Sequence, residues 1–511
     1  MQSSLIKDRL KKIKLWQDFG QSGYATKFKR SHTSGEAKEF IFGNKNNLRN
    51  TEDIMEKPKR SVLVCGRIMQ KREMGALTFL QMQDADGRLQ ICLTKKVLKD
   101  YKFFAKNIDL GDFIGFSGEG FTTKHGEPTI LAAKVQMLSK ALRPLPEKFH
   151  GLQDKEVKYR QRYLDLISNR DTFERFVLRS KIIREIREFF YNKNFIEIET
   201  RTLQTKAGGA MARVFETRSE ALGHTFPLRI SLELEHKMAV AGGMERVFEI
   251  GKCFRNEGQD PSHLPEFTLL EWYCAYQGLE MNKKWTEEMI RQILKKVIGS
   301  EQIEMISTEG RKVKIDFSKK WKTVSFSQLL KKYAGIDVHK ISRTEAQKIA
   351  ISKYQMPRTE AEKLGKGNLL DFIYKKTARP QIIGPIFVTN YPSDLKPLAR
   401  PLKDGTADCF QLLIAGWEIV NSYGELIDPL LQRKLLEDQA RAKKAGDAEA
   451  MEVDLEFLTA MEHGFPPMTG FGMGIDRFIS LLTGQSNLRD TILFPLMLPT
   501  AAAVQIRNKN S

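Results

Sequence analysis

Between residues 61 and 140, apolar positions alternate with polar ones over short runs, a spacing typical of β-strands. The pair Asp86-Gly87 separates two such runs and predicts a tight hairpin. A helical spacing follows at Val97–Ala105. The expected strands are Ser61–Ile68, Thr78–Gln83, Arg88–Leu93, Phe113–Gly118 and Pro128–Val135. Three strands, a helix and two strands in this order predict an OB-fold barrel at 61–140, which commonly binds single-stranded nucleic acid.

Residues 1–60 are predicted to form a basic helical arm. Apolar residues recur at helical spacing from Leu5 to Trp16, and Thr33–Glu36 has the spacing of a capping box. The arm holds fourteen Lys and Arg residues against seven acidic ones. Two interpretations stay open: an amphipathic arm that packs on its own domain, or one that adds phosphate contacts to a bound nucleic acid.

Beyond a polar linker at 141–170, the pattern turns helical at Asp171, which is expected to cap a long helix. This helix has one apolar face, made of Leu178, Ile182, Ile186 and Phe189. The stretch 281–400 is lysine-rich and predicted to be helical. The remaining expected elements are a strand at Phe195–Glu199, alternating strands and turns at 210–275, a strand pair at Cys409–Gly424 and a helical stretch at Ile427–Thr459.

Composition narrows the class of protein. A chain of 511 residues is expected to form two to four domains. The 83 Lys and Arg residues outnumber the 63 acidic ones, and this net charge of +20 favours a polyanionic partner. Five scattered cysteines without a Cys-x-x-Cys pair argue against a disulfide framework or a structural zinc site. No run of eighteen apolar residues exists, so no membrane span is expected and the chain is predicted to be cytoplasmic.

Two segments carry candidate nucleotide chemistry. The first is Cys253–Glu257, followed by His263, Pro265–Phe267 and Glu271–Tyr273. An arginine there can clamp a phosphate and an aromatic ring can stack on a base. The second is Gly470–Arg477, a glycine-rich strand that runs into a helix. Arg-x-Glu alone is usually a surface ion pair, and these glycines lack the context of a dinucleotide site or a P-loop. Together, and in this order, the two segments indicate a nucleotide site.

These segments resemble motifs 2 and 3 of the class II aminoacyl-tRNA synthetases, and the surrounding sequence is most similar to the subclass b lysyl-tRNA synthetases. The stretches Lys140–Pro146 and Tyr159–Leu166 strengthen the resemblance, which covers about residues 20–500. It implies an α+β protein with an OB-fold anticodon-binding domain and a class II catalytic domain at 171–511, whose mostly antiparallel sheet is flanked by helices. The implied segments are motif 1 at about 171–201, motif 2 at about 245–273, an insertion at about 281–400 and motif 3 at about 468–485.

The resemblance implies a ligase that activates lysine with ATP and transfers it to tRNA(Lys). Arg255, Glu257 and Arg477 are then the catalytic residues. ATP would be bound by Arg255, Glu257, His263, Phe267, Glu418, Asn421, Gly474 and Arg477. Arg255 would grip the α-phosphate and the amino-acid carboxylate, while Phe267 and Arg477 would enclose adenine.

A magnesium site is implied at Glu418, with a second metal position at Gln411, where the family has a glutamate. Glutamine supplies a neutral oxygen, so one charge is missing from a site for a hard dication. Ser262 and Leu264 also depart from the family, which has a basic residue and an asparagine there. Motif 1 implies a homodimer, although Arg201 stands where the family has proline.

Lysine would be held by Gly209, Glu233, Arg255, Glu271, Tyr273 and Glu425, with Gly208 beside the first of these. Two carboxylates and a phenol around an ammonium form a charge-assisted cage, and a neutral side chain would leave those carboxylates unpaired. In the barrel, Arg72, Phe79, Gln90 and Glu127 match anticodon-reading positions.

Two alternatives stay open. The departures at Arg201, Ser262, Leu264 and Gln411 suit a catalytically impaired RNA-binding paralog. An aspartyl- or asparaginyl-type ligase is the nearest enzymatic rival. An aspartate pocket needs cations at its base, and the sequence indicates none there.

Overall fold

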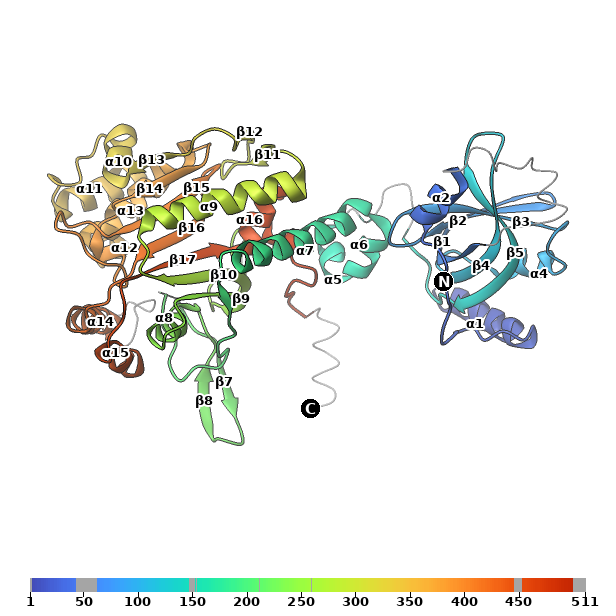
Figure 1. The fold of residues 1–511 in the computed structure, drawn as a ribbon, viewed down its shortest axis with the longest axis horizontal. Coiled ribbons are helices and arrows are strands. Elements are labelled where there is room, and N and C mark those ends of the chain that lie inside the picture. Colours follow the sequence, from blue (N-terminus) through green and yellow to red (C-terminus); the bar gives the residue numbers. More distant parts are fainter. Residues whose placement is uncertain are drawn as a thin grey trace. The chain divides into compact units, whose positions relative to one another are not determined.

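The computed structural model describes residues 2–42, 62–146, 152, 154–210, 212–258, 260–444 and 453–499. The chain divides into two compact units, Met1–Gly151 and Leu152–Ser511. Figure 1 labels the elements of each. The first unit is built on a closed barrel, and the second on an eight-stranded, mostly antiparallel sheet flanked by helices. The expected α+β architecture is therefore confirmed.

The barrel has the strand order β1-β2-β3-β5-β4 and closes where β1 pairs with β4. Its unit consists of α1 (Gln2–Asp18), α2 (Ser34–Phe42), β1 (Val62–Met74), β2 (Leu77–Gln83), β3 (Arg88–Thr94), α4 (Tyr101–Asn107), β4 (Phe113–Thr122) and β5 (Pro128–Ser139). The hairpin expected at Asp86-Gly87 joins β2 to β3. Helix α4 begins at Tyr101 rather than Val97, because a turn between Thr94 and Leu98 precedes it.

The described part of the basic arm packs on the barrel. Trp16 on α1 is fully buried in the barrel core, together with Ala37 and Ile41 of α2. The expected capping box is present, with the Thr33 amide donating to Glu36 Oε2 at 2.7 Å and the Glu36 amide donating to Thr33 Oγ1 at 3.3 Å. Residues 43–61 lie outside the described residues. Residues 2–42 therefore pack on their own domain, and the phosphate contacts of the second interpretation stay a prediction.

The second unit begins with α5 (Lys155–Arg160), α6 (Arg162–Ser168), α7 (Arg170–Tyr191), β6 (Ile196–Glu197), β7 (Glu216–Ser219), β8 (His224–Pro227), α8 (Glu233–Ala241), β9 (Arg246–Phe254), β10 (Glu266–Ala275), α9 (Leu279–Ile293) and η2 (Leu294–Ile298). It continues with β11 (Gln302–Ile306), β12 (Lys312–Asp316), β13 (Lys322–Ser325), α10 (Phe326–Ala334), α11 (Arg343–Tyr354), α12 (Arg358–Ala361), α13 (Lys366–Thr377), η3 (Arg379–Gln381), β14 (Ile386–Thr389) and η4 (Ser393–Leu395). It ends with β15 (Cys409–Ile414), β16 (Trp417–Gly424), α14 (Pro429–Lys444), α15 (Leu455–Glu462), β17 (Met468–Gly474), α16 (Ile475–Leu482) and η5 (Leu488–Thr491).

The large sheet has the order β13-β14-β15-β16-β17-β10-β9-β6, with parallel pairing at its two edges alone and antiparallel pairing between. Helices α7, α9 and α16 cover one face and bury a common apolar core against it (Figure 1). On that face Trp272 of β10 stacks on Phe471 of β17, with ring centroids 3.2 Å apart. The opposite face of these central strands is left to form a cavity.

Two boundary expectations are corrected. The polar linker predicted at 141–170 contains helices α5 and α6. They belong to the second unit because buried Arg162 pairs with Asp165 at 2.6 Å and donates to the backbone carbonyls of Arg489 and Leu493. Helix α7 begins at Arg170, so its cap position is Asn169 rather than Asp171.

The stretch 281–400 is not purely helical, as had been expected. It contains the strand pair β11–β12, and β13 and β14 extend the main sheet. The helix predicted at Ile427–Thr459 is interrupted, since α14 and α15 are separate and residues 445–452 lie outside the described part. Among the described helices, none has the length and apolar character needed to span a bilayer. All five cysteines are free thiols.

Candidate active site

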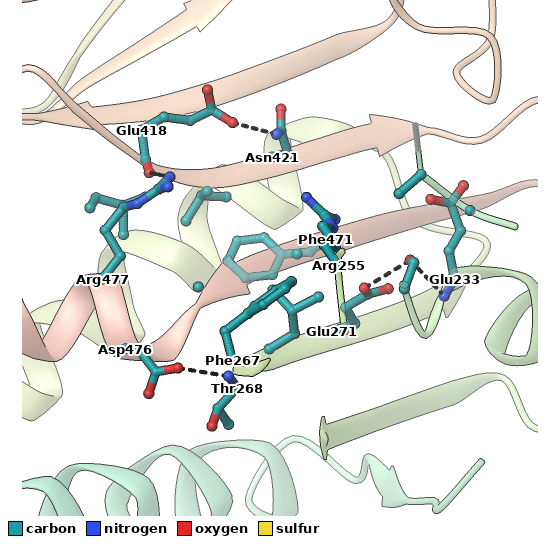
Figure 2. A pocket seen from close by; sticks show the side chains of 18 of the residues that line it. Glu233, Arg255, Phe267, Thr268, Glu271, Glu418, Asn421, Phe471, Asp476 and Arg477 are labelled. Atoms are coloured by element: carbon teal, nitrogen blue, oxygen red, sulfur yellow. Dashed lines mark hydrogen bonds between the residues drawn. The ribbon is translucent and has the colours of Figure 1, made fainter. Parts of the chain in front are cut away.

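A cavity of about 380 Å³ opens over the central strands of the large sheet. Strands β10, β16 and β17, helix α16, the β9–β10 loop and the segment after η4 supply its walls. The sequence-predicted residues that line it are Gly209, Glu233, Arg255, Glu257, His263, Phe267, Glu271, Tyr273, Glu418, Asn421, Gly474 and Arg477. Gln411 and Glu425 do not line it. Figure 2 shows Arg255 and Phe267 between Arg477 on one side and Glu233 on the other.

Glycines on β17 make room for the cavity. In the antiparallel register, Gly472 lies between Glu271 of β10 and Asn421 of β16, and Gly470 lies between Tyr273 and Tyr423. Residues directly opposite each other in adjacent strands point to the same face. Because Gly470 and Gly472 have no side chains, this part of β17 forms the floor of the cavity. The carboxylate, amide and phenol groups of the neighbouring strands extend over it.

Arg255 is positioned by the ends of β9 and β10. Its backbone amide donates to the carbonyl of Pro265 at 2.9 Å, which closes the β9–β10 loop. Its guanidinium lies 5.1 Å from the Phe267 ring centroid and donates to the Ile230 carbonyl at 3.4 Å. A half-buried guanidinium with weak protein partners has donors left for an anion.

The β9–β10 loop is stabilised by an aspartate. Asp260 Oδ1 accepts from the Ser262 amide at 2.6 Å, and Asp260 Oδ2 lies 2.9 Å from His263 Nδ1. Although partial burial opposes the shift, these hydrogen bonds lower the pKa of Asp260 to about 2. Ser262 thus forms its hydrogen bonds within the loop. His263 and Glu257 are both exposed and lie at the rim of the cavity.

A buried aspartate that was not predicted from the sequence joins the segments expected to be motifs 1, 2 and 3. Asp476 at the start of α16 accepts from the Thr268 amide of β10 at 2.7 Å and pairs with Arg179 of α7 at 2.6 Å. Figure 2 shows this bond beside Phe267. The hydrogen bond between Thr268 and Asp476 fixes Phe267 and Arg477 relative to each other, because Phe267 precedes Thr268 and Arg477 follows Asp476 in the sequence. No spacing signal links Arg179 to position 476.

The acidic end of the cavity is not free of cations, contrary to expectation. Lys237 is fully buried, with its ammonium 2.7 Å from Glu233 Oε1 and 2.5 Å from Glu425 Oε2. Glu425 is itself 1% exposed, so it lies behind the cavity wall and contacts Lys237. Position 237 follows Glu233 by one helical turn on α8, which brings the two side chains together.

Glu271 lies at the same end. Its Oε1 accepts from Ser231 Oγ at 3.2 Å and from the Leu232 amide at 3.3 Å, while the Tyr273 hydroxyl donates to Oε2 at 3.2 Å. Burial raises the pKa of Glu271, and neighbouring Glu233 adds to the shift. Gly209, at φ +81°, approaches Ser231 so closely that a Cβ would lie 3.0 Å from its side chain. These contacts shape a small acidic pocket.

The opposite end of the cavity is cationic. Arg477 donates to the Glu418 carbonyl at 2.8 Å, and Glu418 Oε1 accepts from Asn421 Nδ2 at 2.6 Å. Lys396 lines the cavity here and had not been predicted. Among the described residues, no group of three His, Cys, Asp or Glu side chains gathers as a metal site. Glu418 provides one carboxylate, which suits a magnesium ion whose other ligands are phosphates and water.

Three of the four anticodon candidates lie on the neighbouring strands β1, β2 and β3 of the barrel, and Glu127 directly precedes β5. Arg72 of β1 and Cys92 of β3 are the cross-strand partners of Phe79 on β2, and Gln90 pairs with Gln81. Phe79 is half-buried against a small outer cluster, whereas Arg72 and Glu127 are exposed. Gln90 donates to Thr129 Oγ1 at 2.9 Å. Gln81, which lies on the same face of β2 as Phe79, was not among the predicted anticodon candidates.

Residues 154–498 match the family model described as tRNA synthetases class II (D, K and N). The chain belongs to this family. Residues 62–138 match the OB-fold nucleic acid binding domain, as expected for the anticodon-binding domain of a class II tRNA synthetase.

Relatives of this class II tRNA synthetase match nearly the whole chain. It is 40% identical over 496 residues to the lysine–tRNA ligase of Lactococcus lactis subsp. cremoris strain MG1363, covering 96% of this chain and 98% of that protein. It is 39% identical over 501 residues to the lysine–tRNA ligase of Carboxydothermus hydrogenoformans, covering 97% and 98%. It is also 39% identical over 511 residues to that of Shewanella woodyi, covering 98% of each. The expected family is confirmed.

The cavity floor gives a prediction with a built-in contrast. A Cβ at Gly472 would meet nothing closer than Glu271 Cγ at 3.8 Å, whereas one at Gly470 would collide with the Glu425 carboxylate and the Tyr273 ring. Gly472→Ala should therefore fold with a free energy of unfolding within about 1 kcal/mol of wild type. Its methyl group fills the floor, so binding of ATP, of the amino acid, or of both should fall at least about tenfold.

Gly470→Ala should instead lose about 1–3 kcal/mol of stability through overpacking. Urea unfolding measures the free energy of unfolding of both variants. Calorimetric titration measures their affinity for ATP and for the amino acid. Wild-type affinity for both ligands in Gly472→Ala would show that the cavity floor is not a binding surface.

Proposed function

We propose that this class II tRNA synthetase is a lysine–tRNA ligase, which forms lysyl-adenylate from lysine and ATP and transfers the lysyl group to the 3′ end of tRNA(Lys). The observation that carries the proposal is one cavity with an acidic end at Glu233 and Glu271 and a cationic end at Arg477, with Arg255 between them. The two ends suit a diamino acid and a polyphosphate that must react with each other.

Charge balance favours lysine as the amino acid. Glu233 and Glu425 contact the Lys237 ammonium, and Glu271 lies at the same end of the cavity, so three carboxylates against one ammonium leave two negative charges when all are ionised. Lysine brings two ammonium groups and one carboxylate, and Arg255 provides the countercharge for the latter. An aspartate side chain would add negative charge to this acidic end, at a cost of several kcal/mol for the unpaired carboxylates.

The adenylation step needs positioning rather than a base. A lysine carboxylate oxygen attacks the α-phosphorus of ATP, a new P–O bond forms, and the bond to pyrophosphate breaks. Arg255 holds both reacting anions, while Phe267 and Arg477 enclose adenine and Glu257, His263, Asn421 and Gly474 bind the rest of the nucleotide. Preorganised cations acting on developing charge commonly supply the largest share of such catalysis.

Glu418 is the residue that would hold magnesium, which when bound neutralises phosphate charge. In the transfer step the terminal ribose hydroxyl of tRNA attacks the carbonyl carbon of the adenylate and AMP leaves. The hydroxyl proton passes to the departing phosphate, so the chain itself need not provide a base.

The barrel would bind the anticodon through Arg72, Phe79, Gln90 and Glu127. A ring stacks on a base while polar groups meet its edges. A homodimer through motif 1 is also proposed, because Val177, Tyr191 and Ile196 of α7 and β6 are exposed apolar residues. Five free cysteines suit a cytoplasmic location.

The decisive experiment is ATP–pyrophosphate exchange with each of the twenty amino acids. Exchange with lysine alone is expected. Exchange with aspartate or asparagine would establish the rival ligase, and no exchange together with tight tRNA binding would establish an RNA-binding paralog.

Arg255→Ala should lower the exchange rate by about two to three orders of magnitude, because one preorganised charged donor is lost from the transition state. Binding of tRNA should change little. Arg218→Ala is the matched control, since Arg218 is exposed on β7 and pairs with Glu220 at 3.6 Å. Retention of most of the exchange rate in Arg255→Ala would contradict the assigned role.

Lysine binding should release protons. The pKa of Glu271 is raised above its ordinary value of 4.5 by burial, and a bound ammonium stabilises the ionised form. Affinity for lysine should thus increase as pH rises toward the raised pKa of Glu271 and level off once pH passes it. Calorimetry in buffers of different ionisation enthalpy measures the proton number, and Glu271→Gln should decrease it. An unchanged proton number in this variant would exclude Glu271 as the source.

Phe79→Ala should weaken charging of tRNA while leaving lysine-dependent exchange intact. One lost base stack corresponds to about 1–3 kcal/mol in tRNA affinity. Phe113→Ala is the control, because Phe113 is 37% exposed on β4 and its ring contacts Arg67 instead. Comparable effects of both substitutions on tRNA binding would indicate a general loss of barrel stability.

A further inference from the structure

Gln411, at the position of the implied second metal carboxylate, is turned away from the cavity. The Tyr391 hydroxyl donates to Gln411 Oε1 at 2.6 Å, and Gln411 Nε2 donates to Asn421 Oδ1 at 2.9 Å. Asn421 Nδ2 in turn donates to Glu418 Oε1 at 2.6 Å. Both ends of the amide are used within the protein, so Gln411 positions Asn421 and Glu418, and its one neutral oxygen faces Tyr391 rather than the cavity.

A lysine ammonium lies beside this chain of hydrogen bonds. Lys396 Nζ is 3.5 Å from Asn421 Oδ1 and 3.5 Å from the Tyr423 hydroxyl. It also lies 5.4 Å from the Tyr391 ring centroid and 5.5 Å from that of Tyr423. Within the described ranges, no ion pair joins Lys396 to a carboxylate, although its side chain lines the cavity. Two rings and two oxygens hold the ammonium, and its charge is left for a ligand.

The surrounding charges favour an anion over another dication. Glu418 is the carboxylate of this corner, with Arg379 Nη1 3.9 Å away. Arg477 donates to the Glu418 carbonyl at 2.8 Å, and the Lys396 ammonium is 3.5 Å from the side chain of Asn421, which donates to Glu418. Three cations around one carboxylate repel a further metal ion and attract a polyphosphate.

We propose that the Lys396 ammonium takes the place of the divalent cation that a carboxylate at position 411 would hold, so that ATP is bound with the single magnesium ion that Glu418 can reach. A lysine ammonium is a compact point charge suited to phosphate oxygens. This inference rests on the proposed function only in taking ATP as the ligand.

Counting bound metal ions tests the proposal without turnover. Mn²⁺ in place of magnesium would be titrated, with electron paramagnetic resonance detection, into protein saturated with α,β-methylene-ATP. Wild type should bind one Mn²⁺ per active site. Lys396→Met should also bind one, with affinity for the analogue at least about tenfold weaker, because a charged contact is lost. The double variant Lys396→Met/Gln411→Glu should bind two and recover affinity.

Lys375→Met is the matched control, since Lys375 lies nearby on α13 but pairs with Asp371 at 2.7 Å. It should keep wild-type affinity for the analogue. Two Mn²⁺ ions in wild type, or unchanged analogue affinity in Lys396→Met, would overturn the proposal, as would failure of wild type to bind the analogue.

Pyrophosphate exchange separates this inference from the proposed function. Wild-type exchange should not depend on free magnesium once all ATP is complexed, whereas exchange by the double variant should increase with it. Absence of lysine-dependent exchange with one Mn²⁺ still bound would refute the lysine ligase and leave the Lys396 assignment standing.

Discussion

The register between β10 and the glycine strand β17 is the constraint on which the site depends. It places Glu271 opposite Gly472 and Tyr273 opposite Gly470 on the cavity face, and Trp272 opposite Phe471 on the core face. A slip of one residue would exchange these faces, burying Glu271 in the core and exposing Trp272. The Trp272–Phe471 stack and the apolar residues around it therefore hold the side chains of the cavity in place.

Buried charged residues lie next to these strands and determine the charge at each end of the cavity. Beneath the acidic pocket, Glu249 of β9 pairs with Arg229 at 2.8 Å and lies 3.1 Å from His236 Nε2. Burial opposes ionisation of Glu249, but hydrogen bonds from His236 and Thr200 and the charge of Arg229 outweigh it and lower the pKa of Glu249. Removing one partner from such a cluster would leave an uncompensated buried charge, which costs about 3–5 kcal/mol. The cavity thus inherits fixed polarity from its walls, acidic near α8 and cationic near α16.

Local patterns in the sequence were enough to place β9, β10, β17 and the barrel strands, because each has its own alternation, hairpin or glycine signal. The resemblance to class II enzymes then grouped Arg255, Glu271 and Arg477, which lie far apart in the chain. What it missed are long-range ion pairs without a pattern. Arg179 with Asp476 and Arg162 with Asp165 look like ordinary surface charges in the sequence. The pair of Arg162 with Asp165 lies within the segment that was predicted to be a linker. That segment forms the packed helices α5 and α6.

Lys237 removes one premise of the argument against aspartate. The absence of a cation at the pocket base was the argument against aspartate, yet a buried ammonium is present. In the proposed function, lysine is favoured by the balance of charge rather than by the absence of a cation. Two carboxylates contact Lys237, so its positive charge is neutralised within the wall of the cavity. The pocket therefore stays negative as a whole. By separating Glu233 from Glu425, the same ammonium also limits their mutual repulsion, which lets a cluster of carboxylates persist in a buried site.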